Sequence, residues 1–142
     1  MMKHDQEFAT HLEQLLGGAQ AVRITVPGFM PLLVEKIGSS EDGHRLVSLC
    51  QYDEQSGDLM RDPDLVFLFT DLPDGPAAEP VSYSNDYLGI FQEVYRYDEV
   101  GRRTPVLPAL NQDLQEFARA WFATLRDQGF FASTAAREIL SP

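Results

Sequence analysis

The chain has 142 residues, a formal net charge of −11, a hydrophobic content of 44% and a single cysteine. This length suits one domain with a real core, and the composition excludes an intrinsically disordered chain. A single cysteine excludes an internal disulfide, and no apolar run approaches the length of a membrane span. The polar segment 3–7 lacks the apolar core of a signal peptide. We therefore expect a soluble cytoplasmic protein without membrane contact.

All of the net charge lies between Glu41 and Glu99, a segment that contains fourteen acidic and three basic residues. Direct nucleic-acid binding needs a basic face that releases counterions, so this charge disfavours it. Two interpretations remain. The acids imitate the charge of DNA towards a basic protein, or they keep the protein soluble.

The first half of the chain predicts one helix and three strands. Apolar residues recur at helical spacing over 5–16. Alternating apolar and β-branched residues predict strands over 22–26 and 32–37, and extended chain resumes over 45–53. The pair 56–57, Ser-Gly, predicts a hairpin turn.

The segment 65–69 is apolar at every position, which predicts a central strand covered on both faces. Three prolines within 71–80 predict a surface loop, and 81–84 resumes the sheet. The segment 87–95 fits a strand with a glycine bulge or a short helix, and we favour the strand. Its side chains, the C-terminal tail or a second copy of the protein would cover the second face of 65–69.

Apolar residues at helical spacing predict a helix over 111–128. Asn111 would be its N-cap, and Trp121 would dock on the sheet. A short terminal helix is expected near 133–140. The chain thus reads as helix, several strands with short connections, then helix. Short connections imply antiparallel pairing, because parallel strands need long crossovers.

The predicted fold class is α+β. We expect a single domain over 1–142, with an antiparallel sheet of about four to six strands, an N-terminal helix and a long C-terminal helix. Its core would span 5–131, followed by a short helical tail over 132–142. Both main helices would cover one face of the sheet.

Three segments of the sequence resemble a known family: 57–64, 83–89, and 117–121 together with 127–130. They are similar to an uncharacterised bacterial family, a domain of unknown function found on plasmids and genomic islands of proteobacteria. The resemblance covers roughly 27–131. It implies an accessory protein of a mobile element in the cytoplasm, and it implies no chemistry.

The cluster of Asp58, Asp62 and Asp64 offers oxygen ligands, but its spacing fits no EF-hand loop, so we expect turn carboxylates and no metal. Arg61 is expected in a structural ion pair. The sharper alternative is an acid–base pair in a cleft, with Asp62 or Asp86 as the base. Cys50 is expected to be a small, partly buried residue, not a thiolate.

The densest polar and aromatic cluster lies at 83–87. Asn-Asp at a strand end usually forms a turn that bonds its own backbone, whereas tyrosines in such a cluster also suit a protein-binding hot spot. The candidate binding residues are therefore Asp58, Arg61, Asp62, Tyr83, Asn85, Asp86 and Tyr87. We assign no catalytic residue and no cofactor.

The sequence favours a non-enzymatic protein-binding or accessory factor of a mobile genetic element. One alternative is a DNA-mimic inhibitor of a basic protein, and this predicts that the acids of 41–99 gather on one face. Another is a small hydrolase-like enzyme that uses Asp and Tyr residues in a cleft. The expected partner is another protein, and a homodimer is a second hypothesis.

Overall fold

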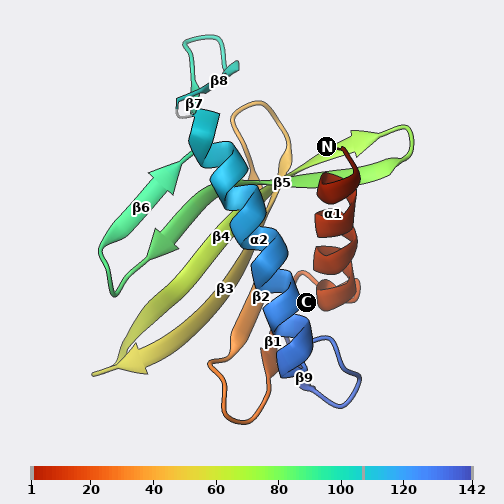
Figure 1. Ribbon diagram of the computed structural model, residues 1–142, viewed down its shortest axis with the longest axis vertical. Helices are drawn as coiled ribbons and strands as arrows, with labels where there is room; N and C mark the ends of the chain where they lie inside the picture. Colours follow the sequence, from red (N-terminus) through yellow and green to blue (C-terminus); the bar gives the residue numbers. More distant parts are fainter. Residues whose placement is uncertain (1, 107, 142) are drawn as a thin grey trace.

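The computed structural model describes residues 2–106 and 108–141, and it contains two layers (Figure 1). One layer is formed by helices α1 (Met2–Leu16) and α2 (Pro108–Gln128). The other is a seven-stranded antiparallel sheet of order β6-β5-β4-β3-β2-β1-β9, beside a separate pair β7-β8. The strands are β1 (Ala21–Thr25), β2 (Leu32–Ser39), β3 (Arg45–Gln55), β4 (Asp58–Leu72), β5 (Gly75–Asn85), β6 (Ile90–Glu93), β7 (Tyr95–Tyr97), β8 (Arg103–Pro105) and β9 (Ala136–Ser141).

Both helices pack on the same face of the sheet, as predicted (Figure 1). The rings of Phe8 in α1, Phe122 in α2 and Phe67 in β4 contact one another with centroid distances of 5.7–5.9 Å. Trp121 is buried against the sheet, and its indole N–H donates to Gln51 Oε1 at 3.2 Å. The docking of Trp121 is therefore confirmed.

The sheet has more than the predicted four to six strands because β9 adds a strand beside β1. The predicted loop over 71–80 is also wrong. β4 continues to Leu72 and β5 begins at Gly75, so the two strands form one long hairpin. β6 pairs only with residues 82–85 of β5. The earlier part of β5 is thus a free edge, where Pro76 and Pro80 need no outward N–H.

The segment 87–95 is not a helix, and the favoured strand is correct for its second half only. Residues 86–89 form a turn in which Gly89 has a φ of +65°, and β6 follows at Ile90. The glycine thus serves a turn and not the predicted bulge. β7 begins directly after Val94.

The predicted helical tail over 132–142 is wrong, because residues 136–141 form β9, which pairs with β1. Tertiary contacts override the local helical preference here. The guanidinium of Arg137 donates to the carbonyl oxygens of Leu15 and Leu16 at 2.7 and 3.3 Å, which satisfies the C-terminal end of α1. Glu138 forms an ion pair with Arg23 of β1 at 2.7 Å.

The long helix starts three residues earlier than predicted, at Pro108. Proline is well tolerated in the first helical turn, where its missing N–H has no helical partner anyway. Asn111 is therefore inside α2 and is not the N-cap. Its side-chain amide instead donates to Glu79 Oε2 at 3.2 Å.

β4 occupies a central position, as predicted for 65–69, but its two faces differ. Leu65, Phe67 and Phe69 join the core beneath the helices. Val66 points to the opposite face, where it is half-buried beside Tyr95 and Tyr97. We call this the helix-free face, because both described helices lie on the other side.

Neither α1 nor α2, within the described residues, has the length and apolarity of a membrane-spanning helix.

Leu49→Ala is expected to lower the free energy of unfolding by about 2–5 kcal/mol, because Leu49 is completely buried in β3 and the shorter side chain leaves a cavity. Urea denaturation followed by the fluorescence of Trp121, the only tryptophan, measures this loss. The control Leu88→Ala, at a side chain that is 68% exposed, is expected to change stability by less than about 0.5 kcal/mol. Equal effects of the two variants would contradict this core assignment.

Candidate functional site: the β5–β6 turn and its edge strand

The side chain of Asp86, just after β5, is clamped by Arg61 of β4. The guanidinium donates to both carboxylate oxygens, from Nε and Nη2, at 3.1 Å each. The backbone N–H of Arg61 also donates to Asp86 Oδ2, and the backbone N–H of Asp86 donates to the Arg61 carbonyl, both at 2.9 Å. A two-pronged guanidinium–carboxylate contact fixes geometry as well as charge. The β5–β6 turn is thereby tied to β4.

The same guanidinium reaches a second carboxylate on the helix-free face. Arg61 Nη1 donates to Asp64 Oδ2 at 3.3 Å, and the hydroxyl of Ser48 donates to Asp64 Oδ1 at 2.7 Å. The expected structural ion pair of Arg61 therefore exists, with Asp86 and Asp64 as its partners. Hydrogen bonds from the side chain and backbone of Arg61 lower the pKa of Asp86 below its usual value.

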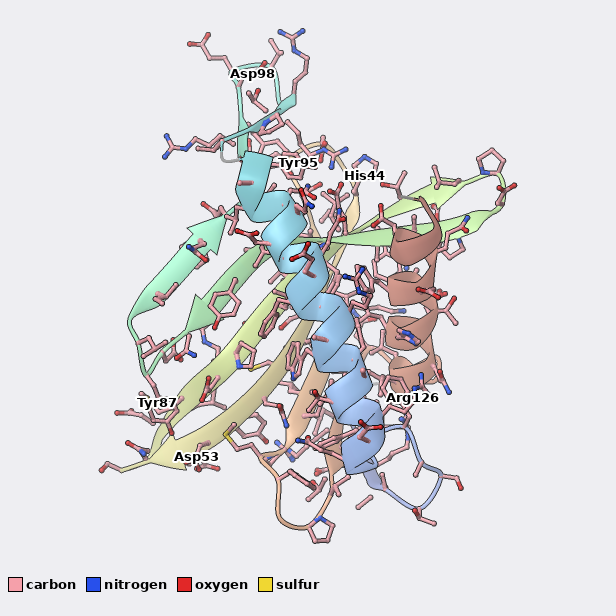
Figure 2. The ribbon with its side chains drawn as sticks, viewed as in Figure 1. His44, Asp53, Tyr87, Tyr95, Asp98 and Arg126 are labelled. Atoms are coloured by element: carbon pink, nitrogen blue, oxygen red, sulfur yellow. The ribbon has the colours of Figure 1, made fainter. Side chains whose placement is uncertain are left out.

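The turn itself is held by Asn85, which is buried. Its amide donates to Asp62 Oδ1 at 2.7 Å, and its Oδ1 accepts from the backbone N–H of Leu88 at 3.1 Å. At the same corner of the molecule the hydroxyl of Tyr87 donates to Asp53 Oδ2 at 3.2 Å (Figure 2). These contacts match the predicted turn role of the Asn-Asp pair.

The structure brings most of the candidate binding residues together. Five of the seven gather at the β5–β6 turn, namely Arg61, Asp62, Asn85, Asp86 and Tyr87. Asp58 is exposed at the start of β4, opposite Gln55, and does not join them. Tyr83 faces the helices, with its ring 5.6 Å from that of Phe117. The gathered polar side chains mostly bond one another, so their role is to support the turn.

Sequence reasoning named Tyr87 but missed the exposed apolar side chains beside it, those of Leu88, Ile90 and Phe91. Tyr87, Leu88, Ile90 and Phe91 are 41%, 68%, 37% and 65% exposed. We call these four residues the edge patch. Ile90 and Phe91 are neighbours in β6 and point to opposite faces, so exposed apolar side chains lie on both sides of this edge of the sheet. The sequence carried the apolar residues, but only the sheet order shows that they lie at an edge.

β6 is the last strand of the sheet, and no strand of the described residues pairs with its outer side. All four of its residues are exposed. Alternate backbone N–H and C=O groups along such a strand point away from the sheet without partners. The opposite edge is β9, which carries the charged residues Arg137 and Glu138. β6 carries one charge, Glu93, and neither lysine nor proline.

The acidic residues of 41–99 are spread along the length of the molecule (Figure 2). Asp53 and Asp98 lie at opposite ends of the molecule (Figure 2). Six acids of this segment form ion pairs with arginines: Asp42, Asp64, Asp71, Glu79, Asp86 and Asp98. Arg102 and Arg103, just outside the segment, supply two of those partners. Four arginines thus compensate part of the negative charge locally.

The groups proposed for an acid–base site do not converge. Asp86 lies with Arg61 on the helix-free side, whereas Tyr83 lies under α2 against Phe117. Cys50 is buried, and desolvation followed by the charge of Asp64 raises the pKa of its thiol to about 12. No group of three or more His, Cys, Asp or Glu side chains in the described part of the chain is arranged to hold a metal ion.

A family model described as a domain of unknown function, DUF6908, matches residues 6–131. The chain belongs to this family. The match starts well before residue 27, where the sequence resemblance begins, so it includes most of α1 as well as α2. Comparison with curated proteins and with solved structures finds no match. The DUF6908 match thus covers strands β1 to β8, most of α1, all of α2 and the β5–β6 turn.

Asp86→Asn is expected to destabilise the protein by about 1–2 kcal/mol at pH 7, because it weakens a charged hydrogen-bond pair that is partly exposed. The pKa of folded Asp86 lies below its unfolded value of about 3.9, so the stabilisation is present above that pH. It is lost as the pH falls through the lowered pKa. Urea denaturation of wild type and variant at pH 7 and at about pH 3 should show the difference shrinking in acid.

Asp58→Asn is the matched control, because Asp58 is an exposed carboxylate outside the Arg61 contacts. It should leave stability nearly unchanged at both pH values. A pH-independent effect of Asp86→Asn would show that the charge of Asp86 does not matter.

Cys50 is expected to react with a thiol reagent at pH 8 at least about a hundredfold more slowly in the folded than in the unfolded protein, since burial keeps the thiol protonated and shielded. Absorbance during reaction with a disulfide reagent, with and without 6 M urea, measures the two rates. Fast reaction of the folded protein would contradict the buried position of Cys50 and would make a reactive thiolate a hypothesis again.

Proposed function

We propose that the protein is a non-enzymatic protein-binding factor that takes up an extended segment of a partner along β6. The observation that carries this proposal is an edge strand with all four residues exposed, next to the four side chains of the edge patch. An extended segment can add to such an edge through backbone hydrogen bonds, and side-chain contacts then supply specificity.

The two edges of the sheet differ in a way that favours β6. Natural edge strands avoid unwanted pairing through charges, prolines or bulges. β9 carries two charged side chains that are engaged by α1 and β1, through Arg137 and Glu138. β6 has only Glu93, at its end. Its length of four residues limits spontaneous aggregation while leaving room for a short segment.

The turn that leads into β6 is preorganised for binding. Arg61, Asn85 and Tyr87 hold it through side-chain hydrogen bonds. A rigid loop loses little conformational entropy when a partner binds, so more of the contact energy appears as affinity. Phe91 and Leu88, the most exposed members of the edge patch, are the expected anchors.

Charge indicates the nature of the partner. The net charge of −11 attracts a basic protein and repels a second copy of the chain. A partner segment with apolar residues flanked by lysine or arginine fits both the edge patch and this field. A homodimer through β6 is the competing arrangement, and the experiment below separates the two.

The other two functions have weaker support. DNA mimicry needs acids that are free to meet a basic protein, and the pairing of six acids of 41–99 with arginines argues against it. A hydrolase needs Tyr83 and Asp86 in one cleft, and they lie on different sides of the sheet. On the resemblance alone, we place the protein among the cytoplasmic accessory factors of bacterial mobile elements.

The test is capture from bacterial lysate by the full-length protein, followed by measurement of the affinity of the purified partner. The double variant Leu88→Ala/Phe91→Ala is expected to weaken that affinity about tenfold or more, as loss of anchors does. The matched control is Ile139→Ala, which removes an aliphatic side chain that is 68% exposed on the opposite edge strand. It should bind like the wild type, and higher salt should slow association.

Two results would overturn the proposal. One is a partner that the double variant binds as tightly as the wild type does. The other is a concentration-dependent dimer in sedimentation that the double variant abolishes, because β6 would then serve self-association.

A further inference from the structure

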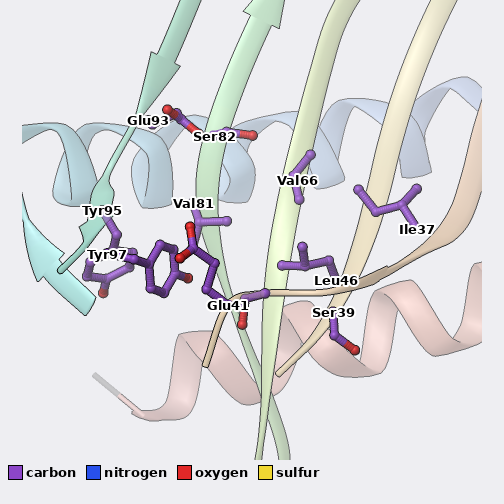
Figure 3. Close-up of a pocket in the computed structure, with 11 residues that line it drawn as sticks. Ile37, Ser39, Glu41, Leu46, Val66, Val81, Ser82, Glu93, Tyr95 and Tyr97 are labelled. Atoms are coloured by element: carbon purple, nitrogen blue, oxygen red, sulfur yellow. The ribbon is translucent and has the colours of Figure 1, made fainter. Parts of the chain in front are cut away.

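A cavity of about 330 Å³ opens on the helix-free face, away from the edge patch. Figure 3 shows it on the side of the sheet opposite the helices. Its floor consists of four aliphatic side chains from β2, β3, β4 and β5: Ile37, Leu46, Val66 and Val81. Ligand cavities typically hold about 300–1,000 Å³, so this one suits a small group. The floor provides an apolar surface for an alkyl chain.

Two tyrosine rings form a wall of the cavity, from Tyr95 and Tyr97 of β7 (Figure 3). Burial raises the pKa of both phenols, that of Tyr95 to about 12, so both rings are neutral at physiological pH. The ring of Tyr95 already attracts a cation, since the guanidinium of Arg103 lies 5.0 Å from its centre. Arg103 is itself held by Asp42 and Glu79 and does not line the cavity.

The charged groups that line the cavity are all acidic. Glu41 and Glu93 stand at its border and are exposed, and no lysine, arginine or histidine is among its described lining residues. The hydroxyls of Ser39, Ser40 and Ser82 complete the polar part. Such a lining repels an anion and attracts a cation. Two exposed carboxylates make a poor metal site, because calcium takes about six to eight oxygen ligands.

We propose that this cavity binds an organic cation carried on an alkyl chain, as in a lysine side chain or a free alkylamine. The chain lies on the aliphatic floor, and the ammonium reaches the carboxylates of Glu41 and Glu93 and the faces of the tyrosine rings. No residue of the edge patch lines this cavity, although Glu93 is the last residue of β6 and the cavity therefore adjoins one end of that strand.

The experiment is a titration of the 15N-labelled full-length protein with n-pentylammonium at pH 7, followed by amide NMR shifts. We expect saturable shifts at Ser39, Ser82 and Glu93. The neutral probe 1-pentanol should bind about tenfold more weakly, because it gains no attraction to the carboxylates. A second pair of probes, N-acetyl-Gly-Lys-Gly-amide and its Gln counterpart, is titrated in the same way.

The double variant Glu41→Gln/Glu93→Gln is expected to weaken pentylammonium binding about tenfold. Glu54→Gln/Asp58→Asn is the matched control, since it removes the same net charge from exposed sites at the β3–β4 hairpin, far along the strands from the cavity. It should leave binding within about twofold of wild type, because exposed charges farther than a Debye length are screened.

Equal binding of pentylammonium and pentanol would overturn the proposal, as would shifts that avoid the cavity or an unchanged affinity of Glu41→Gln/Glu93→Gln. Tighter binding of the lysine peptide than of pentylammonium would assign the cation to a protein side chain. Weaker binding of the lysine peptide than of pentylammonium would assign the cation to a free amine, and either result supports the site. The variant Leu88→Ala/Phe91→Ala should titrate like the wild type, which keeps this test apart from that of the edge strand.

Discussion

The packing of both helices on one face of the sheet is the constraint on which the remaining structure depends. Phe67 of β4 contacts Phe8 of α1 and Phe122 of α2, so one aromatic cluster joins the three elements. Aromatic rings bury large areas and prefer such edge and offset contacts. Because every described helix is used on this side, polar groups on the other face must find partners within the sheet and its loops.

The helix-free face meets this demand through a chain of hydrogen bonds. Ser48 donates to Asp64, and Arg61 bridges Asp64 and Asp86. The same bridge fixes the turn before β6, so stability on this face and presentation of the edge strand have one cause. A low local dielectric strengthens such a network only when its members are satisfied. The acidic segment is tolerated because arginines compensate part of its charge.

Local patterns predicted the elements whose residues interact mainly with near neighbours in sequence. The hairpin at Ser56-Gly57 is confirmed, with both residues at positive φ, and the amphipathic face of α2 is buried as expected. The tail 132–142 became a strand because the distant strand β1 offered an edge. The segment 71–80 forms a local hairpin, and its prolines are tolerated there because β5 has a free outer edge.

The sequence by itself determined the fold class, the helices packed on one face, and the turn chemistry of the Asn-Asp pair, because periodicity and turn preferences act over a few residues. It also named, as candidate binding residues, most of the polar residues that gather around Arg61. Only the tertiary structure decided which strand is an edge, which acids meet arginines and where the cavity beneath Tyr95 and Tyr97 opens. These properties depend on pairing between residues far apart in the chain, which no local pattern records.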